Sequence, residues 1–167
     1  MSLPTRSKLL EKCRNIRKVG RPSSISLHSK KRLCAAAREA ATHAYCPASD
    51  FRVGAAVLSG RMIIRGCNIE NASLGLTLCA ERVAIFNAVS TGRTKIDAIA
   101  ISCPDTPDGC LTNLKMPCGA CRQVLAEFGK PNLPIIIEGV GEFSLASLLP
   151  IAFQFQRIRP RKGSQKR

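Results

Sequence analysis

Residues 79–102 read CAERVAIFNAVSTGRTKIDAIAIS, and this stretch holds the two kinds of element that decide the fold. Apolar residues between positions 79 and 90 recur at helical spacing, and Gly92 is a suitable helix stop. Residues 96–102 form a short apolar run, which predicts a buried strand. A helix followed directly by a buried strand indicates an α/β protein.

The same alternation continues upstream of this stretch. Residues 53–58 and 62–67 are short apolar runs joined by three turn residues, which predicts a β-hairpin. An alanine-rich segment over residues 30–45 predicts a helix that ends before Pro47.

Downstream, a loop of about 14 residues with two prolines and a glycine precedes further short elements. Pro117 suits the first position of a helix and Gly129 suits its end. The expected elements are a loop over 103–116, a helix over 118–128, a strand over 134–138 and a short helix over 143–149 that Pro150 ends. The order of elements predicts an α/β layered sheet.

The length of 167 residues suits one domain, and the charge is unevenly divided along it. The net charge is +15, and all of the excess lies in residues 1–32 and 157–167. The body between them is formally neutral. We therefore divide the chain into a basic N-terminal extension (1–29), a domain (30–156) and a basic C-terminal tail (157–167).

The basic ends allow several interpretations. They attract polyanions, so a nucleic-acid partner is expected only through them, and they equally suit solvated tails. An N-terminus rich in Arg and Ser also resembles a transit segment, which leaves an organelle as the alternative to the expected cytoplasmic location. The longest charge-free stretch has 14 residues and contains Pro150, so we expect no membrane span.

Nine cysteines with no apolar export signal argue for a reducing compartment and against a disulfide scaffold. We expect six of them to be small buried apolar residues: Cys13, Cys34, Cys46, Cys67, Cys103 and Cys110. The other three, Cys79, Cys118 and Cys121, have the spacing of a metal site.

Cys118 and Cys121 lie three residues apart on a predicted helix, so their sulfurs share a face. With Cys79 from the other helix they form a three-thiolate zinc site, and three protein ligands are typical of a catalytic zinc with an open position. Glu81 follows closely and is expected to carry protons there. Two arginines, Arg82 and Arg122, are expected to offset the charge of the thiolates.

The strings Cys79-Ala80-Glu81-Arg82 and Pro117-Cys118-Gly119-Ala120-Cys121-Arg122-Gln123 resemble the zinc signature of the cytidine deaminase family. The first ligand here is Cys rather than His. In this respect the chain resembles the small, homotetrameric branch of the family that acts on free nucleosides. The resemblance implies a three-layer α/β/α fold with a mixed sheet of about five strands. It also implies one Zn2+ per subunit, with Ala80 at the substrate and Gln123 supporting the site.

A second block, Phe51 to Ala56 with Gly66 to Ala72, is similar to the family's nucleoside-gripping segment. The resemblance implies that Phe51 lies against the pyrimidine and that Asn68 and Glu70 bind the ribose hydroxyls. It implies that Phe153 closes a pocket, that of another subunit. Where the family commonly has a Tyr that reaches a neighbouring site, this chain has Leu74.

The resemblance implies deamination of cytidine and deoxycytidine to uridine and deoxyuridine, as in pyrimidine salvage. Three alternatives remain open at this point. The chain could be a blasticidin-type deaminase, although such enzymes typically lack the block at Asn68 to Asn71, or a deaminase of cytosine in RNA or DNA. It could also be a structural zinc module in which Cys67 or Cys103 is the fourth ligand.

Overall fold

The computed structural model describes residues 20–106 and 112–154, which form three layers. A five-stranded sheet in the order β2-β1-β3-β4-β5 makes the middle layer. Its strands are β1 (Gly54–Ser59), β2 (Met62–Cys67), β3 (Ala98–Ser102), β4 (Pro134–Ile137) and β5 (Gly141–Ser144). The sheet is mixed, because β3 and β4 are parallel whereas β1 pairs antiparallel with β2 and β3, and β5 pairs antiparallel with β4.

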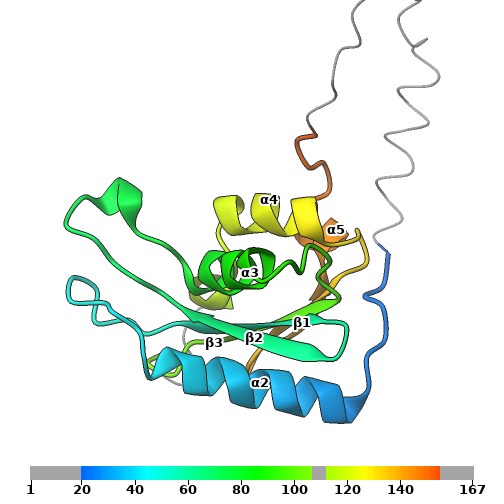
Figure 1. Cartoon of the computed structure of the whole chain (residues 1–167), viewed down its shortest axis with the longest axis horizontal. Coiled ribbons are helices and arrows are strands. Elements are labelled where there is room, and N and C mark those ends of the chain that lie inside the picture. Colours follow the sequence, from blue (N-terminus) through cyan, green and yellow to red (C-terminus); the bar gives the residue numbers. More distant parts are fainter. Residues whose placement is uncertain (1–19, 107–111, 155–167) are drawn as a thin grey trace, which may run out of the picture.

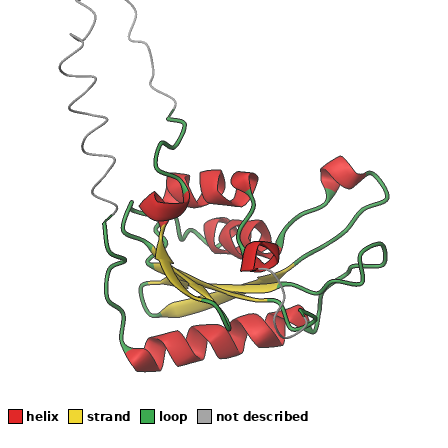
Figure 2. Cartoon of the chain, turned by 180° about the vertical axis from the view of Figure 1, so that it is seen from behind, coloured by secondary structure: helices red, strands yellow, loops and turns green. Residues whose placement is uncertain are grey.

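Helices cover both faces of the sheet. Figure 1 shows α2 (Leu27–Ala41) beneath it, with α3 (Ala80–Ser90), α4 (Gly119–Phe128) and α5 (Leu145–Leu148) on the other face. The view from behind in Figure 2 shows the same three layers. Two short 3-10 helices, η1 (Leu74–Leu76) and η2 (Thr112–Lys115), lie in connections near the site. The predicted three-layer α/β/α architecture is therefore confirmed.

Alternation along β3 explains why two different cores form. Ile99 and Ile101 belong to the large core under α3 and α4, whereas Ala98 and Ala100 belong to the core against α2. Successive side chains of a strand point to opposite faces, so the bulky residues fill one layer and the small ones the other. The small side chains allow α2 to lie close to the sheet.

Two glycines bring helices into direct contact with neighbouring strands. A Cβ atom at Gly54 would lie 1.9 Å from the carbonyl oxygen of Ala37 in α2. A Cβ atom at Gly66 would lie 2.2 Å from the backbone nitrogen of Ala84 in α3. Only glycine fits at either position, so the backbones of α2 and α3 are set directly on the hairpin.

Two of the expected elements differ from the structure. The helix expected over 143–149 is wrong in its first part, because Phe143 lies in β5 and pairs with Ile135 of β4. The helix expected over 30–45 begins earlier, where Ser26 accepts a hydrogen bond from the backbone nitrogen of Ser29. It also ends at Ala41, because the backbone nitrogen of Tyr45 pairs with the carbonyl of Asn68.

The structure qualifies the expectation of six buried cysteines. Four of the cysteines expected to be buried, Cys34, Cys46, Cys67 and Cys103, are only partly buried, and Cys13 and Cys110 lie outside the described residues. None of the helices within residues 20–106 and 112–154 combines the length and the apolar composition that a membrane span requires.

Candidate active site

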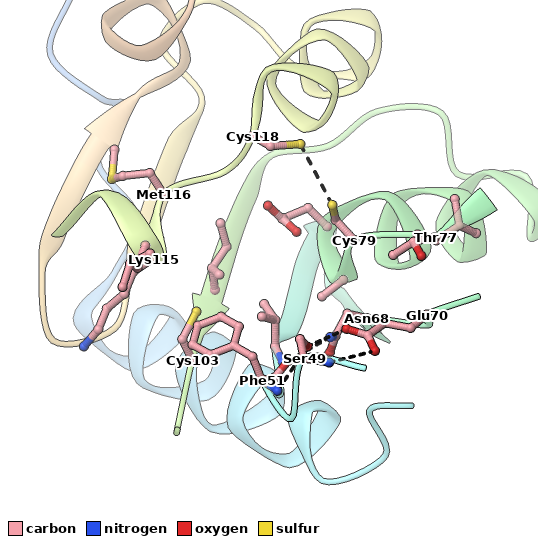
Figure 3. A pocket seen from close by; sticks show the side chains of 16 residues that line it. Ser49, Phe51, Asn68, Glu70, Thr77, Cys79, Cys103, Lys115, Met116 and Cys118 are labelled. Atoms are coloured by element: carbon pink, nitrogen blue, oxygen red, sulfur yellow. Dashed lines mark hydrogen bonds between the residues drawn. The ribbon is translucent and has the colours of Figure 1, made fainter. Parts of the chain in front are cut away.

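Two helix N-termini bring the three predicted metal ligands together. Cys79 is the N-cap of α3 and Cys118 is the N-cap of α4, while Cys121 lies in the first turn of α4. The Sγ atoms of Cys79 and Cys118 are 3.9 Å apart, and those of Cys118 and Cys121 are 3.5 Å apart. Figure 3 shows Cys79 and Cys118 facing each other across the upper part of the cavity. Residues far apart in the chain thus form one cluster of thiols.

This cluster fits a zinc ion with an open position. Tetrahedral coordination with Zn–S bonds of about 2.3 Å places the sulfurs about 3.8 Å apart, close to the distances observed. The three ligand atoms lie within 4.8 Å of one another, and no fourth Cys, His, Asp or Glu joins the group among the described residues. Cys67 instead donates a hydrogen bond to the carbonyl of His43. The described residues therefore do not form a closed four-ligand structural site.

The surroundings of the cluster favour negative charge on sulfur. A hydrogen bond with Cys121 lowers the pKa of Cys79 to about 5, and Arg82 adds to the effect. The same interaction raises the pKa of Cys121. Helix N-termini favour anions as well. The Nε atom of Arg82 is buried and has no hydrogen-bond partner among the described residues, so this guanidinium has capacity left for a negatively charged centre.

Arg122 contacts backbone oxygens. Its Nε donates to the carbonyl of Pro117 at 2.7 Å and its Nη1 to the carbonyl of Leu148 at 2.8 Å. Arg82, by contrast, lies 3.8 Å from the sulfur of Cys79 and 2.7 Å from the carbonyl of Thr77. Of the two arginines, only Arg82 has a hydrogen bond to sulfur in the described part of the chain.

Glu81 lies in the first turn of α3 and is only 4% exposed. Burial raises its pKa to about 7, because a charged carboxylate is poorly solvated there. Glu81 lines the same cavity as Cys79 and Cys118. A carboxyl group that can hold or release a proton thus lies beside the thiol cluster.

The cavity has a volume of about 240 Å³, enough for a small molecule. Its wall opposite the sulfurs includes Phe51, Asn68 and Glu70, while Ala80 lines it from α3. Asn68 is 8% exposed, and its Oδ1 accepts from the backbone nitrogen of Val53 at 2.8 Å. Glu70 accepts from Ser49 Oγ and from the backbone nitrogen of Ala48, and these bonds lower its pKa. Figure 3 shows Phe51, Asn68 and Glu70 gathered at this end.

Two predicted residues lie away from this cavity. Phe153 is 73% exposed and does not line it. Its backbone is fixed by Gln123, whose Nε2 donates to the Phe153 carbonyl at 2.9 Å and whose Oε1 accepts from the Phe153 nitrogen at 3.1 Å. The structure therefore joins these two residues to each other, outside this cavity.

Sequence reasoning missed several residues at the cavity. Ser49 holds Glu70, and Cys103, Leu114, Lys115 and Met116 form a further part of the lining. The only signal for Leu114, Lys115 and Met116 was their position in the long loop expected over 103–116, which indicated no particular side chain. Cys103 was expected only as a buried apolar residue or as a fourth zinc ligand.

Known proteins are similar to this chain in sequence. Residues 27–137 match the family model of the cytidine and deoxycytidylate deaminase zinc-binding region. A cytidine deaminase of Sporosarcina psychrophila is 43% identical over 128 residues, covering 74% of this chain and 90% of that protein. A cytidine deaminase of Mycobacterium tuberculosis is 46% identical over 119 residues, covering 70% and 84%.

Solved structures agree with the sequence matches. The crystal structure of cytidine deaminase from Mycobacterium tuberculosis aligns with a TM-score of 0.65 at 42% identity, covering 75% of this chain and 98% of that one. Cytidine deaminase from Burkholderia pseudomallei aligns with a TM-score of 0.65 at 40% identity, covering 77% and 100%. The predicted resemblance is confirmed, and the chain belongs to the family of cytidine and deoxycytidylate deaminases that carry this zinc-binding region.

Proposed function

We propose that this chain hydrolyses cytidine and deoxycytidine to uridine and deoxyuridine with release of ammonia. The observation that supports this most is that three cysteine sulfurs meet beside a small cavity, which Cys79, Cys118 and the buried carboxyl group of Glu81 line. The bacterial relatives are named cytidine deaminases, which agrees with that chemistry.

Cys79, Cys118 and Cys121 would hold the metal. When bound, zinc supplies Lewis-acid activation of a water molecule at its open position. Glu81 then has two proton transfers to make. It takes a proton from the water and delivers it to ring N3 as the water oxygen bonds to C4. It carries the second water proton to the amino group, the C4–N4 bond breaks, and ammonia leaves.

Unused hydrogen-bonding capacity supports a ribose site at the other end of the cavity. The Nδ2 group of Asn68 has two hydrogens and gives one to the carbonyl of Phe51 at 2.9 Å. The Oε1 atom of Glu70 accepts one bond from Ser49, which leaves a lone pair for a substrate hydroxyl. We therefore assign the ribose hydroxyls to Asn68 and Glu70, and the pyrimidine face to Phe51.

A carboxylate at the ribose also favours a free nucleoside over a polymer. Glu70 has a lowered pKa and is ionised at neutral pH. A phosphate linking the ribose to a next nucleotide would be repelled by that charge. The proposed substrate class is therefore the nucleoside rather than RNA or DNA.

We further propose a homotetramer in which Phe153 of one subunit reaches the cavity of a neighbour. The exposure of Phe153 supports this, since a large aromatic side chain gains little from water. Leu74, 75% exposed on the segment that carries η1, would add an apolar contact. Sedimentation tests the assembly, and a monomer at micromolar concentration would contradict it.

Three metal-binding thiols also need a reducing compartment, which supports a cytoplasmic location.

The direct test is the ultraviolet absorbance of cytidine during incubation with the zinc-loaded chain. Parallel incubations with blasticidin and with a cytosine-containing oligonucleotide compare the other substrate classes. Glu81→Gln should retain zinc and lose a factor of about 10²–10⁴ in kcat. Glu127→Gln is the matched control, because Glu127 is an exposed residue of α4 that does not line the cavity. Equal rates for Glu81→Gln and the parent would contradict the proton-carrying role.

A further inference from the structure

An ion pair beside the cavity joins two segments far apart in the chain. The carboxylate of Asp105 accepts a hydrogen bond from the backbone nitrogen of Arg52 at 2.8 Å and another from its Nε at 2.9 Å. It also accepts from Arg52 Nη2. One carboxylate therefore accepts hydrogen bonds from both the main chain and the side chain of the same residue. We call this arrangement the Arg52–Asp105 latch.

The latch acts on a segment whose other side faces the cavity. Arg52 lies between Phe51 and Val53, whose carbonyl and nitrogen hold the side-chain amide of Asn68. Asp105 therefore fixes the segment from outside while Asn68 is fixed to it from inside. Moving the segment would move both Phe51 and Asn68.

This segment has little regular secondary structure. Residues 50–53 belong to no helix or strand, and backbone hydrogen bonds hold the two ends of the segment, from the Asp50 nitrogen to the Cys46 carbonyl at 2.9 Å and from the Asn68 nitrogen to the Val53 carbonyl at 3.0 Å. Asp50 has a φ of 52°, a left-handed conformation that a residue with a side chain adopts at an energetic cost. Between the two ends, side chains accept from the backbone nitrogens of Phe51 and Arg52: Ser49 Oγ at 3.2 Å and Asp105 Oδ2 at 2.8 Å. The side chain of Arg52 adds its own bonds to Asp105.

We propose that Arg52 and Asp105 are positioning residues that hold Phe51 and Asn68 in place for the substrate. This inference rests on the proposed function for the identity of the substrate. Asp105 follows β3, just past the cavity residue Cys103, so the latch joins two walls of the cavity. Neither Arg52 nor Asp105 lines the cavity itself, which makes their effect indirect.

The expected effect is on substrate binding rather than on the chemical step. The ribose and the ring face do not change during deamination, so contacts from Phe51 and Asn68 stabilise substrate and transition state alike. Asp105→Asn and Arg52→Ala should each raise KM for cytidine about ten-fold and leave kcat within about two-fold. Zinc content should stay at the parental value. Arg52→Lys, which keeps the charge and one donor, should recover part of the loss.

Arg65→Ala is the matched control. Arg65 pairs with Glu39 on the surface and is exposed to the same extent as Arg52, but neither Arg65 nor Glu39 lines the cavity. Its KM should equal that of the parent. The double variant Arg52→Ala/Asp105→Asn should be no worse than Asp105→Asn alone, because Asp105→Asn already removes the carboxylate that the Arg52 side chain pairs with. Additive effects on KM would overturn the latch.

Hydrogen–deuterium exchange separates this inference from the proposed function. In the zinc-loaded chain, amides of residues 48–53 should exchange faster in Asp105→Asn than in the parent, and Arg65→Ala should leave them unchanged. Unchanged exchange in Asp105→Asn would overturn the latch whatever the chain's activity. A parent that does not deaminate cytidine would overturn the proposed function, and faster exchange would still support the latch.

Discussion

Gly66→Ala places one methyl group between β2 and the helix that carries Glu81. The added Cβ atom would lie 2.2 Å from the backbone nitrogen of Ala84 and 2.7 Å from the carbonyl oxygen of Ala80. Both of these atoms belong to the backbone of α3, so no side chain can rotate away. The helix must move relative to the sheet.

The size of the effect follows from these distances. Ordinary contact begins at 3.4 Å, so α3 must move away from β2 by about 1 Å. Overpacking of this kind costs about 1–3 kcal/mol of folding free energy. Cys79 and Glu81 move with the helix, and a displacement of about 1 Å in a catalytic group costs about 100-fold in rate. We therefore expect a folded but destabilised protein whose kcat is about 100-fold lower.

Cytidine turnover, zinc content and urea unfolding of the purified variant test this together. Gly20→Ala is the control, because a Cβ atom there meets nothing within 4 Å. It should retain the parental kcat and stability. If Gly66→Ala has the parental kcat and unfolding midpoint, direct contact between α3 and β2 does not position the site.

Three further outcomes are expected. Asn68→Ala leaves the partly buried backbone partners at Phe51 and Val53 without their hydrogen bonds, so it should cost about 1–3 kcal/mol in urea unfolding as well as raising KM; an unchanged midpoint would contradict this. A zinc chelator should abolish deamination, and added Zn2+ should restore it while the circular dichroism stays constant; activity that survives complete metal removal would exclude the thiol site. The Arg52 side chain lowers the pKa of Asp105 from 3.8 to about 2, so this carboxylate stabilises the fold above about pH 4 and its contribution is lost as pH falls towards 2. Unfolding of the parent and of Asp105→Asn should accordingly differ at pH 6 and converge near pH 2, and a constant difference would refute the linkage.

The fold was predictable where periodicity and turn residues agree. The hairpin, α3 and α4 were expected within a residue or two of their observed ends, because apolar spacing and glycine or proline punctuation mark the same boundaries. The strand β5 was not expected. Its four residues, Gly141–Ser144, have no clear alternation, and they form a strand because the edge of β4 is available for pairing.

The chemical centre of the site was predictable because its ligands are close in sequence or mark helix starts. Cys118 and Cys121 share a helical turn, and Glu81 lies within the same turn as Cys79. The Arg52–Asp105 pair could not be predicted, since 53 positions separate its members and many arginines compete for each acid. The carbonyl partners of Arg122 were equally hidden, because Leu148 reaches α4 only in the folded chain.

The two glycine contacts connect α2, which forms the layer farthest from the cavity, to the position of α3, which carries Glu81. Gly54 and Gly66 lie on paired strands at adjacent register positions, one against α2 and the other against α3. The three atoms nearest to an added Cβ at either glycine all belong to helix backbone, so no side chain can rotate away there to absorb a small movement. Enlarging a residue of α2 at this contact, such as Ala37, would therefore change the rate of an enzyme whose substrate that residue never meets.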